Sequence, residues 1–198
     1  MRVRKPAITL GTLCLVAALA IGVIQAGNNS NTSTTAKPPT PLTRAQVAKA
    51  IPGAPAPLAA LRGRVSELAG GGTKAFDAQL RALRGYPVVV NAWAEWCHPC
   101  RYELPFFQRE AVARGGKVAF LGINAKDDAD KARSLAARIP LPYPSFVDHG
   151  GDLIRRFRAV GLPVTIFYDA SGKRQMVHQG VFPSEQALSA AIDRYATR

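Results

Sequence analysis

Two cysteines separated by two residues are the most informative chemical feature of the sequence. Cys97 and Cys100 enclose His98 and Pro99. Thiols at this spacing can close a small disulfide ring and open it again by exchange with another thiol. A purely structural disulfide across so short a loop would constrain the unfolded chain very little. The spacing therefore predicts a redox-active pair.

A zinc half-site is the alternative use of two cysteines at this spacing. Zinc in a structural site needs two more ligands, and the sequence offers three histidines, His98, His149 and His178, but no second pair of closely spaced cysteines. We expect His149, in a turn, and His178, in a strand, to be solvated. The sequence therefore favours redox chemistry and predicts no metal site.

The residues on either side of the cysteines predict a strand followed by a helix. Residues 88–93 form a continuous apolar run, which is typical of a strand buried on both faces, and Trp93 is expected in the core. A helix is expected over about 98–113, with a kink at Pro105. Cys97 would then lie at the helix N-terminus, where free backbone N–H groups and the helix dipole stabilise a thiolate. This position makes Cys97 the expected nucleophile.

The rest of the chain beyond residue 57 alternates between helical and strand patterns. We expect helices at 74–83, 127–138, 151–159 and 184–196 and strands at 117–123, 145–148, 163–168 and 173–178, with a hairpin turn at 169–172. Residues 58–68 fit either a short helix or a strand. This order predicts an α/β domain over residues 58–198, with a central mixed β-sheet flanked by helices and the strand 88–93 in its middle.

The N-terminus has the pattern of a segment that directs export. Three basic residues within the first five precede an uncharged apolar run. Ile8–Ala26 has 19 residues, close to the ~20 that span a bilayer and longer than a usual signal core. We favour an uncleaved membrane anchor over residues 1–26, with a signal peptide removed after Ala26 as the alternative. Cys14 lies inside this run and is expected to be an inert apolar residue.

Residues 27–57 have the composition of a linker. The segment is first rich in Asn, Ser and Thr and then rich in proline, and a short helix near 43–50 is compatible with its sequence. We expect it to tether the domain to the membrane.

The chain is strongly basic. Its formal net charge is +13, of which +10 lies beyond the first five residues. The basic residues are scattered, with the densest cluster at 155–158. We interpret them as a solvated basic face, and an acidic partner or an anionic surface is the alternative. Export argues against a nucleic acid as the ligand.

Residues 88–105 read VVVNAWAEWCHPCRYELP. This segment resembles the active site of the thioredoxin superfamily, and more narrowly that of its exported, membrane-linked TlpA/ResA-like branch. Asn91 stands where cytoplasmic thioredoxins usually carry aspartate, and Glu103 and Pro105 complete the Cys-Arg-x-Glu-x-Pro pattern of the branch. Residues 161–165 (GLPVT) resemble the cis-proline loop, although many relatives have a polar residue where Val164 stands. The resemblance extends from about residue 74 to the C-terminus and implies a thioredoxin-like fold.

The resemblance assigns roles to the residues that match the pattern. Cys97 attacks a disulfide, and Cys100, which faces inward, resolves the mixed disulfide that results. Glu103 is close to the same helical face as Cys100 and takes the proton of its thiol. The alternative for Glu103 is an exposed helix acid beside Arg101 and Arg109.

Five further residues belong to the expected site. A cationic His98 would stabilise the thiolate and make the pair more oxidising, and a solvent-facing spacer is the alternative. Pro99 is compatible with helix initiation. Trp96 is expected to shield the thiols and to offer a contact surface. The resemblance implies a cis bond between Leu162 and Pro163, in a loop whose backbone pairs with a bound substrate segment.

Together these features predict an extracytoplasmic thiol-disulfide oxidoreductase that is anchored in the membrane or secreted after cleavage. Its redox group would be the Cys97–Cys100 disulfide, with no organic cofactor or metal. Its partners would be exported cysteine-containing proteins and a membrane thiol-disulfide electron donor or acceptor. The resemblance favours a reductase of the kind used in cytochrome c maturation, whereas His98 favours a disulfide-forming oxidase. A copper metallochaperone would typically carry a CxxxC motif, and a peroxidase a Thr-x-x-Cys context, neither of which fits the segment.

Overall fold

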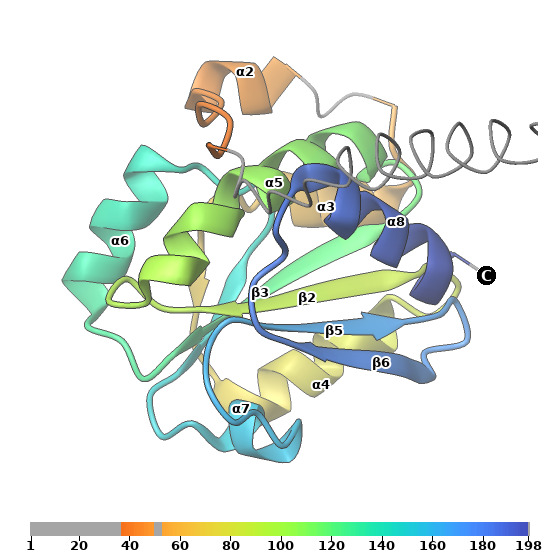
Figure 1. Cartoon of the computed structure of the whole chain (residues 1–198). Coiled ribbons are helices and arrows are strands. Elements are labelled where there is room, and N and C mark those ends of the chain that lie inside the picture. Colours follow the sequence, from red (N-terminus) through yellow and green to blue (C-terminus); the bar gives the residue numbers. More distant parts are fainter. Residues whose placement is uncertain (1–36, 50–52, 198) are drawn as a thin grey trace, which may run out of the picture. The chain divides into compact units, whose positions relative to one another are not determined.

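The computed structural model describes residues 37–49 and 53–197 (Figure 1). They belong to a compact unit that extends from Ala36 to the C-terminus. The expected anchor, Cys14 and the first part of the expected linker lie outside the described residues. Within the described part of the chain, no helix has the length and apolar character needed to cross a bilayer. The division into residues 1–26, 27–57 and 58–198 therefore stays a prediction.

A six-stranded mixed sheet forms the centre of the domain, in the order β1-β4-β3-β2-β5-β6. The strand β2 runs parallel to β3 and antiparallel to β5, and it occupies an interior position as expected. The pairs β1–β4 and β3–β4 are parallel, and β5–β6 is antiparallel. The strands are β1 Leu68–Ala69, β2 Val88–Trp93, β3 Ala119–Ala125, β4 Ser145–Asp148, β5 Val164–Tyr168 and β6 Arg174–Gln179.

Helices cover both faces of this sheet. In Figure 1, α5 and α8 lie on one side, and α4 and α7 lie on the other. The chain passes through Pro105 without ending α5. The side chains of Asp128 and Ser184 cap the N-termini of α6 and α8 by accepting hydrogen bonds from backbone N–H groups. The helices are α2 Arg44–Lys49, α3 Ala56–Arg62, α4 Gly72–Ala82, α5 His98–Arg114, α6 Ala129–Arg138, α7 Asp152–Arg156 and α8 Glu185–Tyr195.

The side chains of β2 point alternately into two apolar clusters, one on each face of the sheet. Val89 and Trp93 pack into the cluster that contains residues of α5 and α8. Val88, Val90 and Ala92 pack into the cluster that contains residues of α4 and α7. Because successive side chains of a strand point to opposite faces, Asn91 lies on the α5 side. The apolar run is thus explained by burial on both faces, and the core position expected for Trp93 is confirmed.

The region before β2 contains more structure than the sequence predicted. The ambiguous segment 58–68 forms most of α3 and then leads into β1, which pairs with β4. The predicted order lacked this edge strand, because a strand of two residues is too short to show an alternating pattern of apolar and polar residues. The predicted helix 151–159 was too long: α7 ends at Arg156, and Arg158 adopts a left-handed backbone (φ 55°). The other predicted elements from residue 74 onward end within two residues of the observed limits.

Residues 40 and 42 form hydrogen bonds with α5. The side chain of Gln108 accepts a hydrogen bond from the Leu42 N–H (2.6 Å) and donates one to the Leu42 carbonyl (2.9 Å). Val47 of α2 is fully buried, and Arg109 donates to the Thr40 carbonyl (3.1 Å). A part of the expected linker is therefore attached to the helix that begins at the cysteine pair.

Candidate redox site

Cys97 and Cys100 form a disulfide at the N-terminus of α5, with an S–S distance of 1.98 Å. Cys97 is the N-cap residue, and its Sγ accepts a hydrogen bond from the Cys100 backbone N–H (3.2 Å). Cys100 is fully buried, whereas Cys97 keeps 4% of its surface exposed. Both cysteines are therefore buried in the disulfide form, and Cys97, the N-cap residue, is the less completely buried of the two.

The residues next to the disulfide face the solvent. His98 and Pro99 are exposed, and Pro99 lies in the first turn of α5, where its missing N–H is not needed. Trp96 is 58% exposed, and its indole N–H donates to the Lys126 carbonyl (3.0 Å). A large apolar ring is therefore held in the solvent one residue before Cys97.

The Leu162–Pro163 peptide bond is cis, as the resemblance implied. Pro163 is buried, and Leu162 is half-buried. The strand β5 begins at the next residue, where Val164 pairs with Ala92 near the end of β2. Because β2 leads from there into the disulfide loop, the proline loop and the disulfide lie at the same end of the sheet.

Glu103 is completely buried on α5, so the alternative of an exposed helix acid is wrong. Its Oε1 accepts a hydrogen bond from Asn91 Nδ2 (3.0 Å), and its Oε2 accepts one from the Phe182 N–H (2.9 Å). Burial raises the pKa of Glu103 to about 8, although both hydrogen bonds favour the charged form. A carboxyl group that changes its charge near neutral pH therefore lies three residues after Cys100.

Two further polar residues near Glu103 were missed by the sequence reasoning. Tyr143 is buried, and burial together with the negative charge of Glu103 raises the pKa of its hydroxyl. Thr165 is fully buried and pairs with Asn91 across β2 and β5. Alternation along 163–168 could have placed Thr165 on the α5 side, whereas no sequence pattern marks Tyr143.

The two distant histidines differ in their environments. His149 is exposed, as expected. His178 is only partly solvated, because its residue has intermediate exposure and its ring stacks on Phe182 with centroids 4.1 Å apart. Among the described residues, no three potential metal ligands come together.

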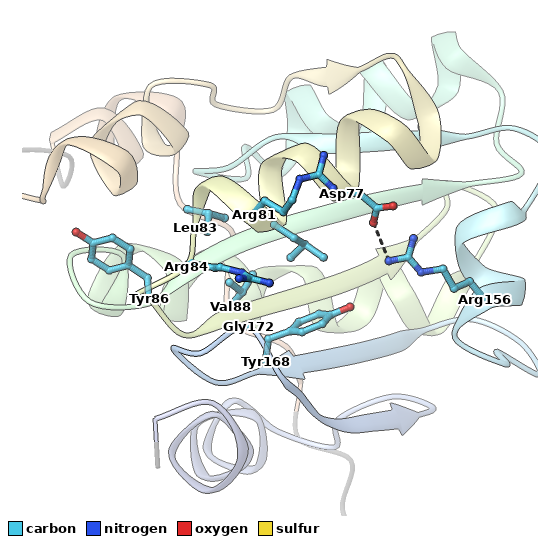
Figure 2. Close-up of a pocket in the computed structure, with 10 residues that line it drawn as sticks. Asp77, Arg81, Leu83, Arg84, Tyr86, Val88, Arg156, Tyr168 and Gly172 are labelled. Carbon is cyan, nitrogen blue, oxygen red and sulfur yellow. Dashed lines mark hydrogen bonds and ion pairs between the residues drawn. The ribbon is translucent and has the colours of Figure 1, made fainter.

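A basic pocket of about 200 Å³ lies away from the disulfide (Figure 2). It includes Val88, at the start of β2, whereas the disulfide loop follows the end of this strand. Arg156 pairs there with Asp77 (2.7 Å), and Arg81 and Arg84 also line the pocket. This pocket therefore contributes no group to the redox site.

The sequence pattern of the AhpC/TSA family matches residues 52–176, which is more than half of the chain. This protein belongs to the AhpC/TSA family. It is 39% identical over 100 residues to the thiol:disulfide interchange protein DsbE of Pseudomonas fluorescens biotype C, a match that covers 50% of this chain and 54% of that protein. It is 25% identical over 113 residues to the thiol-disulfide oxidoreductase ResA of Geobacillus kaustophilus, a match that covers 57% of this chain and 65% of that protein. The chain thus spans less than two thirds of the length of these relatives.

Solved structures confirm the predicted thioredoxin-like fold. DsbF of MTB superposes with a TM-score of 0.53 at 24% identity, covering 58% of this chain and 84% of that structure. A thiol:disulfide interchange protein from Chlorobium tepidum TLS superposes with a TM-score of 0.52 at 24% identity, covering 58% of this chain and 83% of that structure. The resemblance stated from residues 88–105 and 161–165 is confirmed at the level of fold and family.

Proposed function

We propose that the protein is an exported thiol-disulfide oxidoreductase that exchanges the Cys97–Cys100 disulfide with cysteine-containing proteins. The observation that carries the proposal is a disulfide at the N-terminus of α5, next to the exposed residues Trp96, His98 and Pro99, with a buried carboxyl group three residues after Cys100. The names of the relatives, thiol:disulfide interchange protein and thiol-disulfide oxidoreductase, describe the same class of reaction.

The reaction on a target disulfide follows from the two cysteine environments. The Cys97 thiolate attacks one target sulfur, which forms a mixed disulfide and releases the first target thiolate. Glu103 takes the proton of the Cys100 thiol, and the Cys100 thiolate then attacks Cys97 Sγ and releases the second target thiolate. Two electrons pass to the target, and the disulfide is restored. The reverse sequence would oxidise a target dithiol.

The surface around the disulfide suits a protein substrate. The exposed ring of Trp96 and the half-buried Leu162 offer apolar contacts. The backbone before Pro163 offers hydrogen bonds to an extended segment of the substrate. In this proposal His98 influences the thiolate electrostatically, and Pro99 fixes the first turn of α5. The resident redox group is the disulfide itself, and the reaction requires no metal or organic cofactor.

The N-terminal sequence and the names of the relatives support the proposed location and partners. A membrane anchor, or a signal peptide, would place the domain outside the cytoplasm. A reductase there depends on a membrane thiol-disulfide donor that supplies electrons, and an oxidase on an acceptor that removes them. We favour the reductase, acting on exported cysteine-containing proteins as in cytochrome c maturation.

The equilibrium reduction potential of the full-length protein in glutathione buffers tests the direction. A value near about −270 mV supports a reductase, and a value near about −120 mV supports a disulfide-forming oxidase. The Cys100→Ser variant should accumulate a mixed disulfide with its substrate, whereas Cys97→Ser should form none. Cys14→Ser is the matched control and should exchange like the wild type. Full exchange by Cys97→Ser would contradict the proposal.

A further inference from the structure

Three strands carry a polar residue at matching positions on the α5 side of the sheet. Asn91 of β2 pairs with Thr165 of β5, and Thr165 pairs with His178 of β6. Side chains directly opposite each other in antiparallel strands have Cβ atoms about 4.5–5.5 Å apart. Figure 1 shows β2, β5 and β6 side by side. Asn91, Thr165 and His178 therefore form a polar row that begins at Glu103, which Asn91 contacts, and ends on the edge strand β6.

Each member of the polar row has a buried polar atom without a hydrogen-bond partner among the described residues. These atoms are Asn91 Oδ1, Thr165 Oγ1 and His178 Nε2. Buried polar atoms are normally hydrogen-bonded, and internal water with about three polar partners commonly links them. The three atoms comprise a carbonyl acceptor, a hydroxyl that donates and accepts, and a ring nitrogen. Their chemistry fits a connected hydrogen-bond chain.

The Glu103 end of the polar row needs an acceptor. Both oxygens of Glu103 already accept hydrogen bonds, from Asn91 and from the Phe182 N–H. When the carboxyl group becomes protonated, its new O–H requires an acceptor. Within the described residues, the Asn91 carbonyl and the Thr165 and Tyr143 hydroxyls have unused acceptor capacity on this side of the sheet.

The His178 end of the polar row is held in a fixed orientation. Its ring stacks on Phe182 at an interplanar angle of 20°, and Phe182 is the residue whose N–H binds Glu103. Burial lowers the pKa of His178, and a hydrogen bond to the Val181 backbone opposes that shift. The ring is thus neutral at neutral pH and can accept a proton. His178 lies on the edge strand β6 and keeps part of its surface exposed, although Nε2 itself is buried on the side of the polar row.

We propose that Thr165 and His178 form the proton route between Glu103 and solvent, with Thr165 and internal water joining the carboxyl group to His178 Nε2. The proposal rests on the proposed function, in which Glu103 takes the Cys100 proton. Glu103 can take that proton only as a carboxylate, so the proton that it carries below about pH 8 must leave first. This proton passes from the Glu103 carboxyl group through the Thr165 hydroxyl to the imidazole, and the imidazolium releases it to water. No electrons move in this step, and Glu103 returns to a carboxylate.

The groups around the polar row leave Glu103 and His178 as its proton-exchanging pair. Glu103 acts electrostatically on Tyr143, whose raised pKa keeps its hydroxyl neutral near pH 7, so this hydroxyl, like that of Thr165, can relay a proton but does not hold an extra one. The other groups acting on Glu103 are the Asn91 amide and the Phe182 N–H, which do not titrate. The Val181 backbone and the ring of Phe182 face His178.

The test uses the full-length protein with glutathione bound to Cys97 as a mixed disulfide. The rate of glutathione release is measured between about pH 5 and 9. Thr165→Val and His178→Gln should each slow the release roughly a hundredfold, the lower end of the range for loss of a proton-transfer group. Thr165→Ser keeps the hydroxyl, and His149→Gln changes an exposed histidine, so both should match the wild type. Added imidazole, a small proton carrier, should restore the rate of His178→Gln.

The outcomes separate a proton route from a structural role. Thr165→Val removes a buried hydroxyl with no described partner, so a structural role predicts unchanged stability and an unchanged rate. The proposal is overturned if Thr165→Val releases glutathione at the wild-type rate, even where His178→Gln fails to fold. It is also overturned if His178→Gln releases glutathione slowly and imidazole does not restore the rate.

Two further outcomes distinguish the route from the proposed function. If the wild type releases no glutathione, the proposed function fails as well. If Glu103→Gln releases glutathione slowly while the Thr165 and His178 variants release it at the wild-type rate, only the proton route is rejected.

Discussion

At Glu103, burial and hydrogen bonding act on the same carboxyl group in opposite directions. The Asn91 amide and the Phe182 N–H favour the carboxylate, whereas complete removal from water favours the neutral acid. The pKa of about 8 shows that burial is the larger effect. A side chain that is ordinarily charged in neutral solution is thereby held close to its midpoint, which suits repeated uptake and release of a proton.

The raised pKa of Glu103 makes stability depend on pH. A glutamate in the unfolded chain has a pKa of about 4.3, so between that value and about 8 the folded protein holds a proton that the unfolded chain has lost. The free energy of unfolding should therefore fall as pH rises through this window, by on the order of 1 kcal/mol per unit. Urea unfolding of wild type and Glu103→Gln at several pH values measures the difference, because the variant should lack this slope.

A matched control uses an exposed glutamate. The pKa of Glu67 is lowered by its hydrogen bond to Arg64, so its contribution to stability is lost only at acidic pH. Glu67→Gln should therefore keep the wild-type slope between about pH 5 and 8. Equal slopes for wild type and Glu103→Gln would contradict a high pKa for the buried group.

Sequence reasoning identified the residues of this site that stand in a local motif and missed those that only the fold brings in. Cys97, Cys100 and Glu103 occupy neighbouring positions of one helix, so their spacing alone relates them. Tyr143 and His178 come from distant segments, and nothing near them in the chain indicates a carboxyl group. The environment of His178 depends on the ring of Phe182, which only the tertiary structure places against it.

At the scale of elements, α5 links the redox site to the N-terminal segment. The helix begins at the disulfide, carries Glu103 one turn further on, and holds residues 40–42 through Gln108 and Arg109. Gln108 is fully buried and also donates to the Pro140 carbonyl (2.7 Å). One amide group thus joins α5 to the N-terminal segment and to the residues before β4.

Removal of the Gln108 amide should release the N-terminal segment. Gln108→Ala leaves two carbonyl groups and one N–H without their partner, which costs about 1–3 kcal/mol for each group that stays buried. We expect faster hydrogen exchange in residues 40–48 and faster cleavage by trypsin after Arg44. Hydrogen-exchange mass spectrometry of the full-length protein measures the effect. Arg109→Ala removes an exposed bond and should change exchange much less, so an equal effect of both substitutions would contradict the anchoring role.

The elements that the sequence predicted well are the long ones with a clear period. The strand β2 and the helix α5 were located within one residue because an apolar run and a proline-containing CxxC segment mark them. The strand β1 has two residues, and its pairing with β4 is a contact between distant segments. The attachment of residues 40–49 was not expected, because a proline-rich composition indicates a linker and does not reveal a buried partner such as Gln108.

At the scale of the molecule, the net charge of +13 influences encounters with other molecules. A positive protein attracts anionic reagents, and salt screens the attraction, because the Debye length falls from about 30 Å at about 0.01 M to about 3 Å at about 1 M. Reduced protein should therefore react faster with an anionic aromatic disulfide at low salt. Cystamine, which is cationic, should show the opposite dependence.

Stopped-flow rates at several salt concentrations measure this effect. An uncharged disulfide serves as the control, and its rate should change little with salt. The same salt dependence for the anionic and the cationic reagent would show that the charge of the protein has no influence at Cys97.

The alternation of β2 also has a practical consequence for anyone who redesigns this protein. Val88, Val90 and Ala92 turn away from the cysteines and pack towards α4 and α7, whereas Asn91 turns towards Glu103. A laboratory that wants a more heat-resistant catalyst can therefore vary the apolar residues beneath α4 and α7 and select for melting temperature alone. The electron-exchange chemistry resides on the opposite side of the same six residues, so the two properties can be optimised in separate libraries.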